Sequence, residues 1–152
     1  MLDKWQLKNI KLNMKFAEFE FQPNEADEEA AWHMYVELIT RISTQRLDFD
    51  HGDEKAALES IYKLFDITRK ILHNNGRGCK EFTRLAVIIL NQVIRPFTAK
   101  WHKLSLAGAF SDPEQCQKFR NELENLQSYL RNYTALLAEM AKVEDLTDIV
   151  EY

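Results

Sequence analysis

Apolar residues recur at gaps of three and four positions along the last third of the chain. Because this spacing averages about 3.5 residues, it predicts a single apolar seam along one side of a long helix. Such a helix is stable only when other elements cover its seam, which indicates a helical bundle. The series comprises Cys116, Phe119, Leu123, Leu126, Leu130, Tyr133, Leu137 and Met140, and the helix is expected to run to about Val143.

Three earlier segments have helical spacing and are separated by capping residues. Asn24 and Asp53 are of the type that caps a helix N-terminus, and Gly76 suits the left-handed conformation that ends a helix. Asp112 and Pro113 likewise predict the start of the last helix. The three earlier helices are expected at about 24–43, 53–75 and 79–108.

Two features distinguish the third helix. The run Leu85–Leu90 is apolar on every side, which predicts that this segment is the most buried element of the bundle. Pro96 lacks the N–H group of a helical residue and crowds the preceding turn, so we expect the chain to kink or break there.

The first 22 residues predict a β strand or ribbon instead of a helix. Apolar and polar residues alternate here with the period of two that a strand with one buried face requires. No later segment has this pattern, so the backbone of the ribbon must pair within itself, with a second copy or with another protein. We therefore expect an interface formed by Ile10, Leu12, Met14, Phe16, Phe19 and Phe21, of which the last two continue the alternation in the opposite phase.

The pattern as a whole predicts a mainly α protein. We expect one domain over residues 1–152, a single antiparallel bundle of four to five helices. A short N-terminal β strand or ribbon at 1–22 precedes the bundle, and an acidic tail at 144–152 follows it.

Composition and charge narrow the function classes. The net charge of -4 argues against a general nucleic-acid binder, although a local basic patch remains compatible with it. No apolar run is long enough to cross a bilayer, so no membrane association is expected. Two cysteines, Cys79 and Cys116, are too few for a disulfide framework, which favours a cytoplasmic protein without a disulfide between them. No cofactor or metal site is predicted, since the segment 48–54 lacks the ligand series of a calcium loop.

The densest group of chemically versatile side chains is the segment 95–102, RPFTAKWH. Arg95 and His102 are seven residues apart, so they face the same side if the helix is continuous. This segment resembles the signature of HEPN-fold ribonucleases, an arginine and a histidine separated by six residues, with Pro96 where that family usually has a polar residue. The resemblance implies His102 as general acid or base and Arg95 as the group that stabilises phosphate charge. A purely structural alternative has Arg95 satisfying carbonyls exposed by a kink.

Two functions of different classes follow. The first is a non-enzymatic helical interaction or assembly protein, which forms a homodimer or docks onto a larger protein through its N-terminal ribbon. The alternative is a metal-independent HEPN-type ribonuclease of a toxin or antiviral defence system, and RNA is a partner only in this case. A third reading, a nucleotide or small-ligand sensor, depends on a polar pocket between helices.

Overall fold

The structure is a computed structural model that describes residues 22–41 and 53–149. Within these ranges the chain is almost entirely helical, which confirms the expected mainly α class. The elements are α3 (Glu25–Ile39), α4 (Glu54–Asn75), the 3-10 turn η1 (Gly76–Gly78), α5 (Lys80–Ile88), the π-helix η2 (Ile89–Ile94), α6 (Arg95–Leu106), the 3-10 turn η3 (Ala109–Ser111), α7 (Pro113–Ala141) and the 3-10 turn η4 (Thr147–Ile149).

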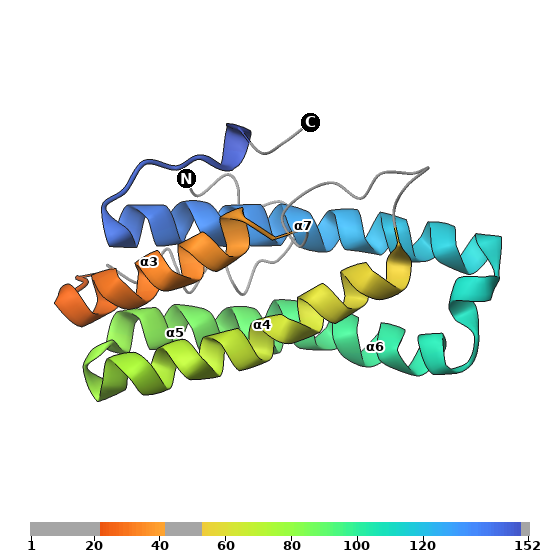
Figure 1. Ribbon diagram of the computed structural model, residues 1–152, viewed down its shortest axis with the longest axis horizontal. Coiled ribbons are helices and arrows are strands. Elements are labelled where there is room, and N and C mark those ends of the chain that lie inside the picture. The colour runs from red at the N-terminus through yellow and green to blue at the C-terminus, as the bar shows by residue number, and fades with distance from the viewer. Residues whose placement is uncertain (1–21, 42–52, 150–152) are drawn as a thin grey trace.

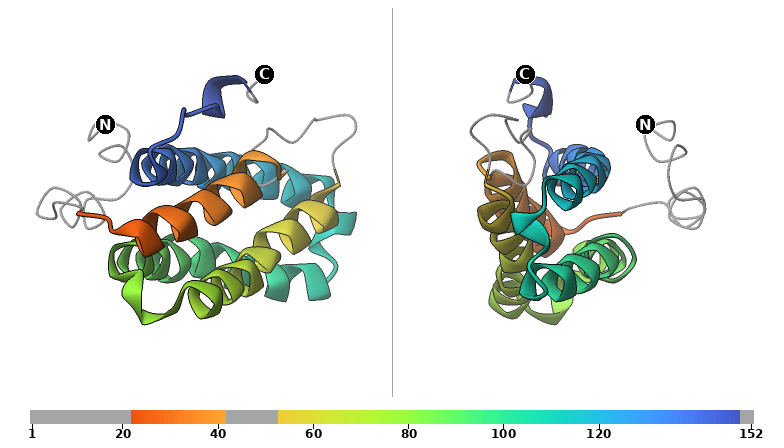
Figure 2. Two further views of the ribbon diagram at one scale, coloured as in Figure 1. Left: turned by 60° about the vertical axis from the view of Figure 1, so that its left-hand side comes forward. Right: turned by 90° about the vertical axis from the view of Figure 1, so that its right-hand side faces the viewer.

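The described elements form an antiparallel bundle (Figure 1). Because α5, η2 and α6 follow one another without a gap, they act as one long helix beside α3, α4 and α7. An end-on view shows α3 and α4 on one side and α7 and the α5–α6 helix on the other (Figure 2). In this arrangement α3 packs against α7 and α4, and α4 packs against α6.

Side-chain caps fix the helix ends largely where the sequence predicts them. Asn24 caps α3, since its side chain accepts a hydrogen bond from the backbone N–H of Asp27. Asp53 caps α4 through the backbone N–H of Ala56. Gly76 ends α4 at a φ of 72°, a conformation that a residue without a Cβ adopts at low cost. α3 ends at Ile39 and not near Ser43 as expected.

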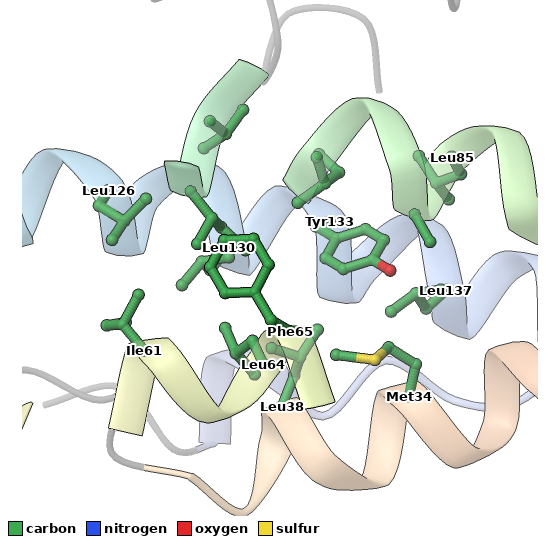
Figure 3. Packing of buried hydrophobic residues seen from close by; sticks show 14 of the residues in the cluster. Met34, Leu38, Ile61, Leu64, Phe65, Leu85, Leu126, Leu130, Tyr133 and Leu137 are labelled. Atoms are coloured by element: carbon green, nitrogen blue, oxygen red, sulfur yellow. The ribbon is translucent and has the colours of Figure 1, made fainter. Parts of the chain in front are cut away.

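The predicted seam of α7 is the centre of the hydrophobic core. Its residues from Phe119 to Met140 are all buried, whereas Cys116, at the start of the seam, is half-buried. Side chains of α3, α4 and α5 pack around these residues of α7 (Figure 3). The contributors labelled there are Met34 and Leu38 of α3, Ile61, Leu64 and Phe65 of α4, Leu85 of α5, and Leu126, Leu130, Tyr133 and Leu137 of α7.

The prediction that Leu85–Leu90 is the most buried element of the bundle is wrong. Leu85, Ala86 and Ile89 are buried, but Val87 is 41% exposed. The physical reason is the position of the α5–α6 helix at a corner of the bundle, where neighbouring helices cover only part of its circumference. An apolar run shorter than two turns therefore has residues on the solvent side as well.

Pro96 neither breaks nor interrupts the helix. The turn before it widens into the π-helix η2, in which the backbone N–H of Arg95 bonds to the carbonyl of Leu90, five residues earlier. Pro96 then occupies the first turn of α6, where a missing N–H is tolerated. The expected break does not occur: a wide turn precedes Pro96, and the backbone stays helical from Lys80 to Leu106.

Beyond α7 the chain turns back over the bundle (Figure 1). Lys142 ends α7 in the left-handed region at a φ of 61°. The hydroxyl of Tyr35 donates to the carbonyl of Glu144 and accepts from the N–H of Leu146, both at 3.0 Å. The part of the expected acidic tail that the structure describes is therefore tied to α3.

The expected ribbon and its six interface residues lie outside the described residues, so the ribbon stays a prediction. None of the helices in the described part of the chain is long and apolar enough to cross a membrane.

Candidate functional site

A groove of about 410 Å³ lies between α4 and α6. Its volume falls within the range of small-ligand sites. We call it the α4–α6 groove and define it by its lining residues Tyr62, Lys63, Phe65, Asp66, Arg69, Arg95, Thr98 and Ala99.

Arg95 is an exposed residue that is held in place by two contacts. Its Nε donates to Oδ1 of Asn91 at 3.0 Å, and its guanidinium carbon lies 4.9 Å from the ring centroid of the buried Phe65. Both contacts are with side chains, an amide and an aromatic ring, instead of the main-chain carbonyls that the structural alternative for Arg95 expects. The contacts orient the guanidinium group and leave its Nη donors without a hydrogen-bond partner among the described residues. These donors can bind an anion that enters the groove.

His102 lies two turns further along the same helix, about 10 Å from Arg95 along the axis. It is exposed, and its ring meets the ring of Tyr62 edge-on, with the centroids 5.7 Å apart and the planes at 77°. Neither ring nitrogen has a hydrogen-bond partner within residues 22–41 and 53–149. The imidazole can therefore exchange a proton with a ligand without first breaking a hydrogen bond to these residues.

Tyr62 connects the two residues of the motif. It is 38% exposed, and it both contacts His102 and lines the groove that contains Arg95. Its hydroxyl lies 3.4 Å from the carbonyl oxygen of Thr98 on α6. The ring is thus fixed between α4 and α6 with part of its surface in solvent.

The α4–α6 groove is positively charged although the chain as a whole is acidic. Lys63, Arg69 and Arg95 supply three cations, and Asp66 supplies one anion. Asp66 is already paired with Arg69, with 2.6 Å between Oδ1 and Nη2. The sum is two positive charges in a chain of net charge -4. This groove is a local basic patch of the kind that the overall charge leaves open.

A second groove, between the other side of α6 and α7, has a different character. Its volume is about 290 Å³, and its only charged lining residues are Lys100 and Glu122. The two form a 2.6 Å ion pair, and Glu122 also accepts a hydrogen bond from Nε1 of the buried Trp101. Because these two charges are paired with each other, this groove has no excess of positive charge and is less suited to bind an anion than the α4–α6 groove.

The structure brings together the two catalytic candidates and adds residues that were not predicted. Arg95 and His102 share one exposed side of α6, as their spacing predicts. Tyr62, Asp66 and Arg69 of α4 complete the site and were missed. A signal for them existed, because positions 62, 66 and 69 share a helix face that lies beside the apolar stripe of α4.

The cysteines and the acidic side chains give less support to a functional site. Cys79 and Cys116 are free thiols, the first buried and the second half-buried. Burial is the main cause that raises the pKa of the Cys116 thiol, which disfavours a reactive thiolate. In the ranges 22–41 and 53–149, no group of three histidine, cysteine or acidic side chains is placed to hold a metal ion.

Comparisons with protein-family models, with curated proteins and with solved structures found no match. The resemblance to HEPN-fold ribonucleases therefore rests on residues 95–102 and on the helical class of the fold.

Proposed function

We propose that the protein is a metal-independent endoribonuclease whose site comprises Arg95, His102 and the α4–α6 groove. One observation carries the proposal: Arg95 and His102 are both exposed on the same side of an unbroken helix, beside a groove with an excess of positive charge. A buried His102, or a helix broken at Pro96, would have separated them.

The two side chains have complementary roles in the proposed reaction. His102 accepts the proton of a ribose 2′-hydroxyl, and the 2′ oxygen forms a bond to the adjacent phosphorus. The bond between phosphorus and the 5′ oxygen breaks, and the 5′ oxygen takes a proton from water. The products are a 2′,3′-cyclic phosphate and a 5′-hydroxyl. Arg95 stabilises the charge that builds up on the phosphate oxygens.

Mutation of each member of the pair tests this proposal. We expect His102→Ala to lower the rate of cleavage of a labelled single-stranded RNA by about 100-fold or more, the usual contribution of a general acid or base. Arg95→Ala should cause a loss of similar size. Both losses should persist in excess EDTA. The unfolding midpoints should change little, because both side chains are exposed and their contacts lie at the surface.

Matched controls are available at the other end of the bundle. His73 at the end of α4 and Arg77 in η1 are exposed residues of the same two types. His73→Ala and Arg77→Ala should leave cleavage unchanged. The proposal fails if the purified protein cleaves no RNA, or if the control variants lose as much activity as the variants of the motif.

We also propose, as a second function, assembly through the N-terminal ribbon. The described ranges contain no strand, so residues 22–41 and 53–149 offer the ribbon no sheet edge to join. A homodimer or a larger protein partner would supply this edge. Removal of residues 1–22 should then abolish self-association in sedimentation experiments and leave the helical circular dichroism intact. Unchanged association of the shortened chain would contradict this proposal.

A further inference from the structure

We infer that the α4–α6 groove binds one unpaired nucleotide of an RNA strand, with the base on the ring of Tyr62 and a phosphate beside Arg69 and Arg95. The inference rests on the proposed ribonuclease function and adds the substrate contacts that the resemblance does not provide. It depends on the position of one aromatic ring between two sets of polar groups.

Tyr62 has the surface that a stacking residue needs. The residue is 38% exposed, and the contact of its ring with His102 and the polar contact of its hydroxyl with Thr98 hold it in one orientation. A fixed aromatic ring binds any base through its face and loses little conformational freedom in doing so. A base on this ring lies between His102 and the α4–α6 groove, because Tyr62 contacts the first and lines the second.

The cations of the groove are placed for the phosphate. Arg95 is oriented by Asn91 and Phe65. Arg69 and Lys63 are six residues apart on α4 and both line the groove. Arginine binds phosphate oxygens through paired N–H donors, which makes it the usual residue for this contact. The volume of about 410 Å³ suits one nucleotide. A base that is paired and stacked within a duplex cannot also lie on the ring of Tyr62. The substrate must therefore present the nucleotide unpaired.

Asp66 lowers the affinity of the groove for RNA. Its carboxylate pairs with Arg69 at 2.6 Å, so a phosphate must compete with it for the guanidinium group. Asp66→Asn removes this competitor and one negative charge from the groove. We expect the substitution to tighten RNA binding by about two- to fivefold, the value of an exposed ion pair. A residue with only a structural role would not strengthen binding when it is changed.

The test measures binding without cleavage. The probe is a fluorescent eight-nucleotide RNA with 2′-O-methyl groups, which cannot react through its 2′ oxygens. Tyr62→Ala should weaken binding about tenfold or more, and Tyr62→Phe should bind like the wild type because its ring remains. Trp32→Ala is the matched control, since Trp32 is 42% exposed but lies on α3, away from the groove. Arg69→Ala should lower the salt dependence of binding by about one phosphate contact.

This design distinguishes a free nucleotide from a nucleotide within an RNA strand. It also distinguishes failure of this inference from failure of the proposed ribonuclease function. Wild-type protein that binds adenosine monophosphate as tightly as the oligonucleotide, or a duplex as tightly as a single strand, overturns the inference. Equal binding by Tyr62→Ala and wild type overturns it as well. A parallel cleavage assay with unmodified RNA reports on the proposed function: binding that depends on Tyr62 without cleavage refutes the ribonuclease, and cleavage that ignores Tyr62 refutes only the inference.

Discussion

Asp27 links the first turns of two helices, and its removal should be the most damaging single change to a polar side chain in the described bundle. The residue is 1% exposed. Its Oδ2 accepts the backbone N–H of Asn24 and completes the capping box of α3, and its Oδ1 accepts the backbone N–H of Phe82 in α5, both at 3.0 Å. Cys79, the N-cap residue of α5, makes no side-chain cap of its own. Asp27 therefore caps α5 from another helix.

The cost of Asp27→Ala follows from these two bonds. A hydrogen bond to a charged group contributes about 1.5–3 kcal/mol, and a buried donor that loses its partner has a desolvation cost of similar size. We therefore expect the free energy of unfolding to fall by about 3–5 kcal/mol, a large part of the stability of a typical domain. Asp27→Asn keeps one acceptor oxygen and should lose roughly half as much.

Asp53 is the matched control, because it caps α4 through a single 3.2 Å bond at an exposed position. Asp53→Ala should cost about 1 kcal/mol, as for an ordinary N-cap. Urea unfolding followed by far-ultraviolet circular dichroism measures all three variants. If Asp27→Ala does not fold, the comparison of Asp27→Asn with Asp53→Ala still tests whether Asp27 caps both helices. A loss for Asp27→Asn no larger than that for Asp53→Ala would refute the double-capping role.

Three further outcomes follow from the core and the wide turn. Tyr133 is 2% exposed and its hydroxyl has no partner among the described residues, so Tyr133→Phe should raise the free energy of unfolding by about 1 kcal/mol in urea titrations. Burial raises the pKa of Tyr133 above its ordinary value, so the folded state keeps this proton to higher pH than the unfolded chain. Stability should hold below about pH 10 and fall above it, and Tyr133 alone should contribute up to about 1.4 kcal/mol per pH unit, so the fall should be less steep in Tyr133→Phe. Part of the fall should remain, because burial also raises the pKa of Tyr129. Pro96→Ala should change the free energy of unfolding by less than about 1 kcal/mol and leave RNA cleavage unchanged, since the wide turn already relieves the proline.

Local patterns predicted the local features well. The seam of α7 and the caps Asn24, Asp53 and Gly76 depend on residues close together in the sequence, so periodicity and residue type were enough to find them. The partner of Asp27 in α5 is 55 residues away, and nothing in the first turn of α3 indicates it. Tyr62 and Arg69 were missed for the same reason, because only the packing of α4 against α6 makes them neighbours of Arg95.

The wide turn of η2 is explained by the spacing of the buried residues in this helix, and which residues are buried is known only from the bundle. The buried residues Leu85, Ile89, Val93, Phe97 and Trp101 are each four positions apart. In a regular α-helix, with about 100° per residue, each step of four would rotate the buried face by about 40°, and four steps would turn it by about 160° away from the core. A π turn accommodates more residues per turn and removes part of this drift.

The spacing of four therefore requires the wide turn independently of Pro96, which is why we expect little change from Pro96→Ala. The same correction keeps Phe97 and Trp101 in the core, and the opposite side of α6 then faces outward. Arg95 and His102 lie on that side, beside Tyr62 of α4. A regular helix would rotate this pair away from the α4–α6 groove or expose the aromatic core residues. The packing of the core and the position of the candidate site thus depend on the same six residues of η2.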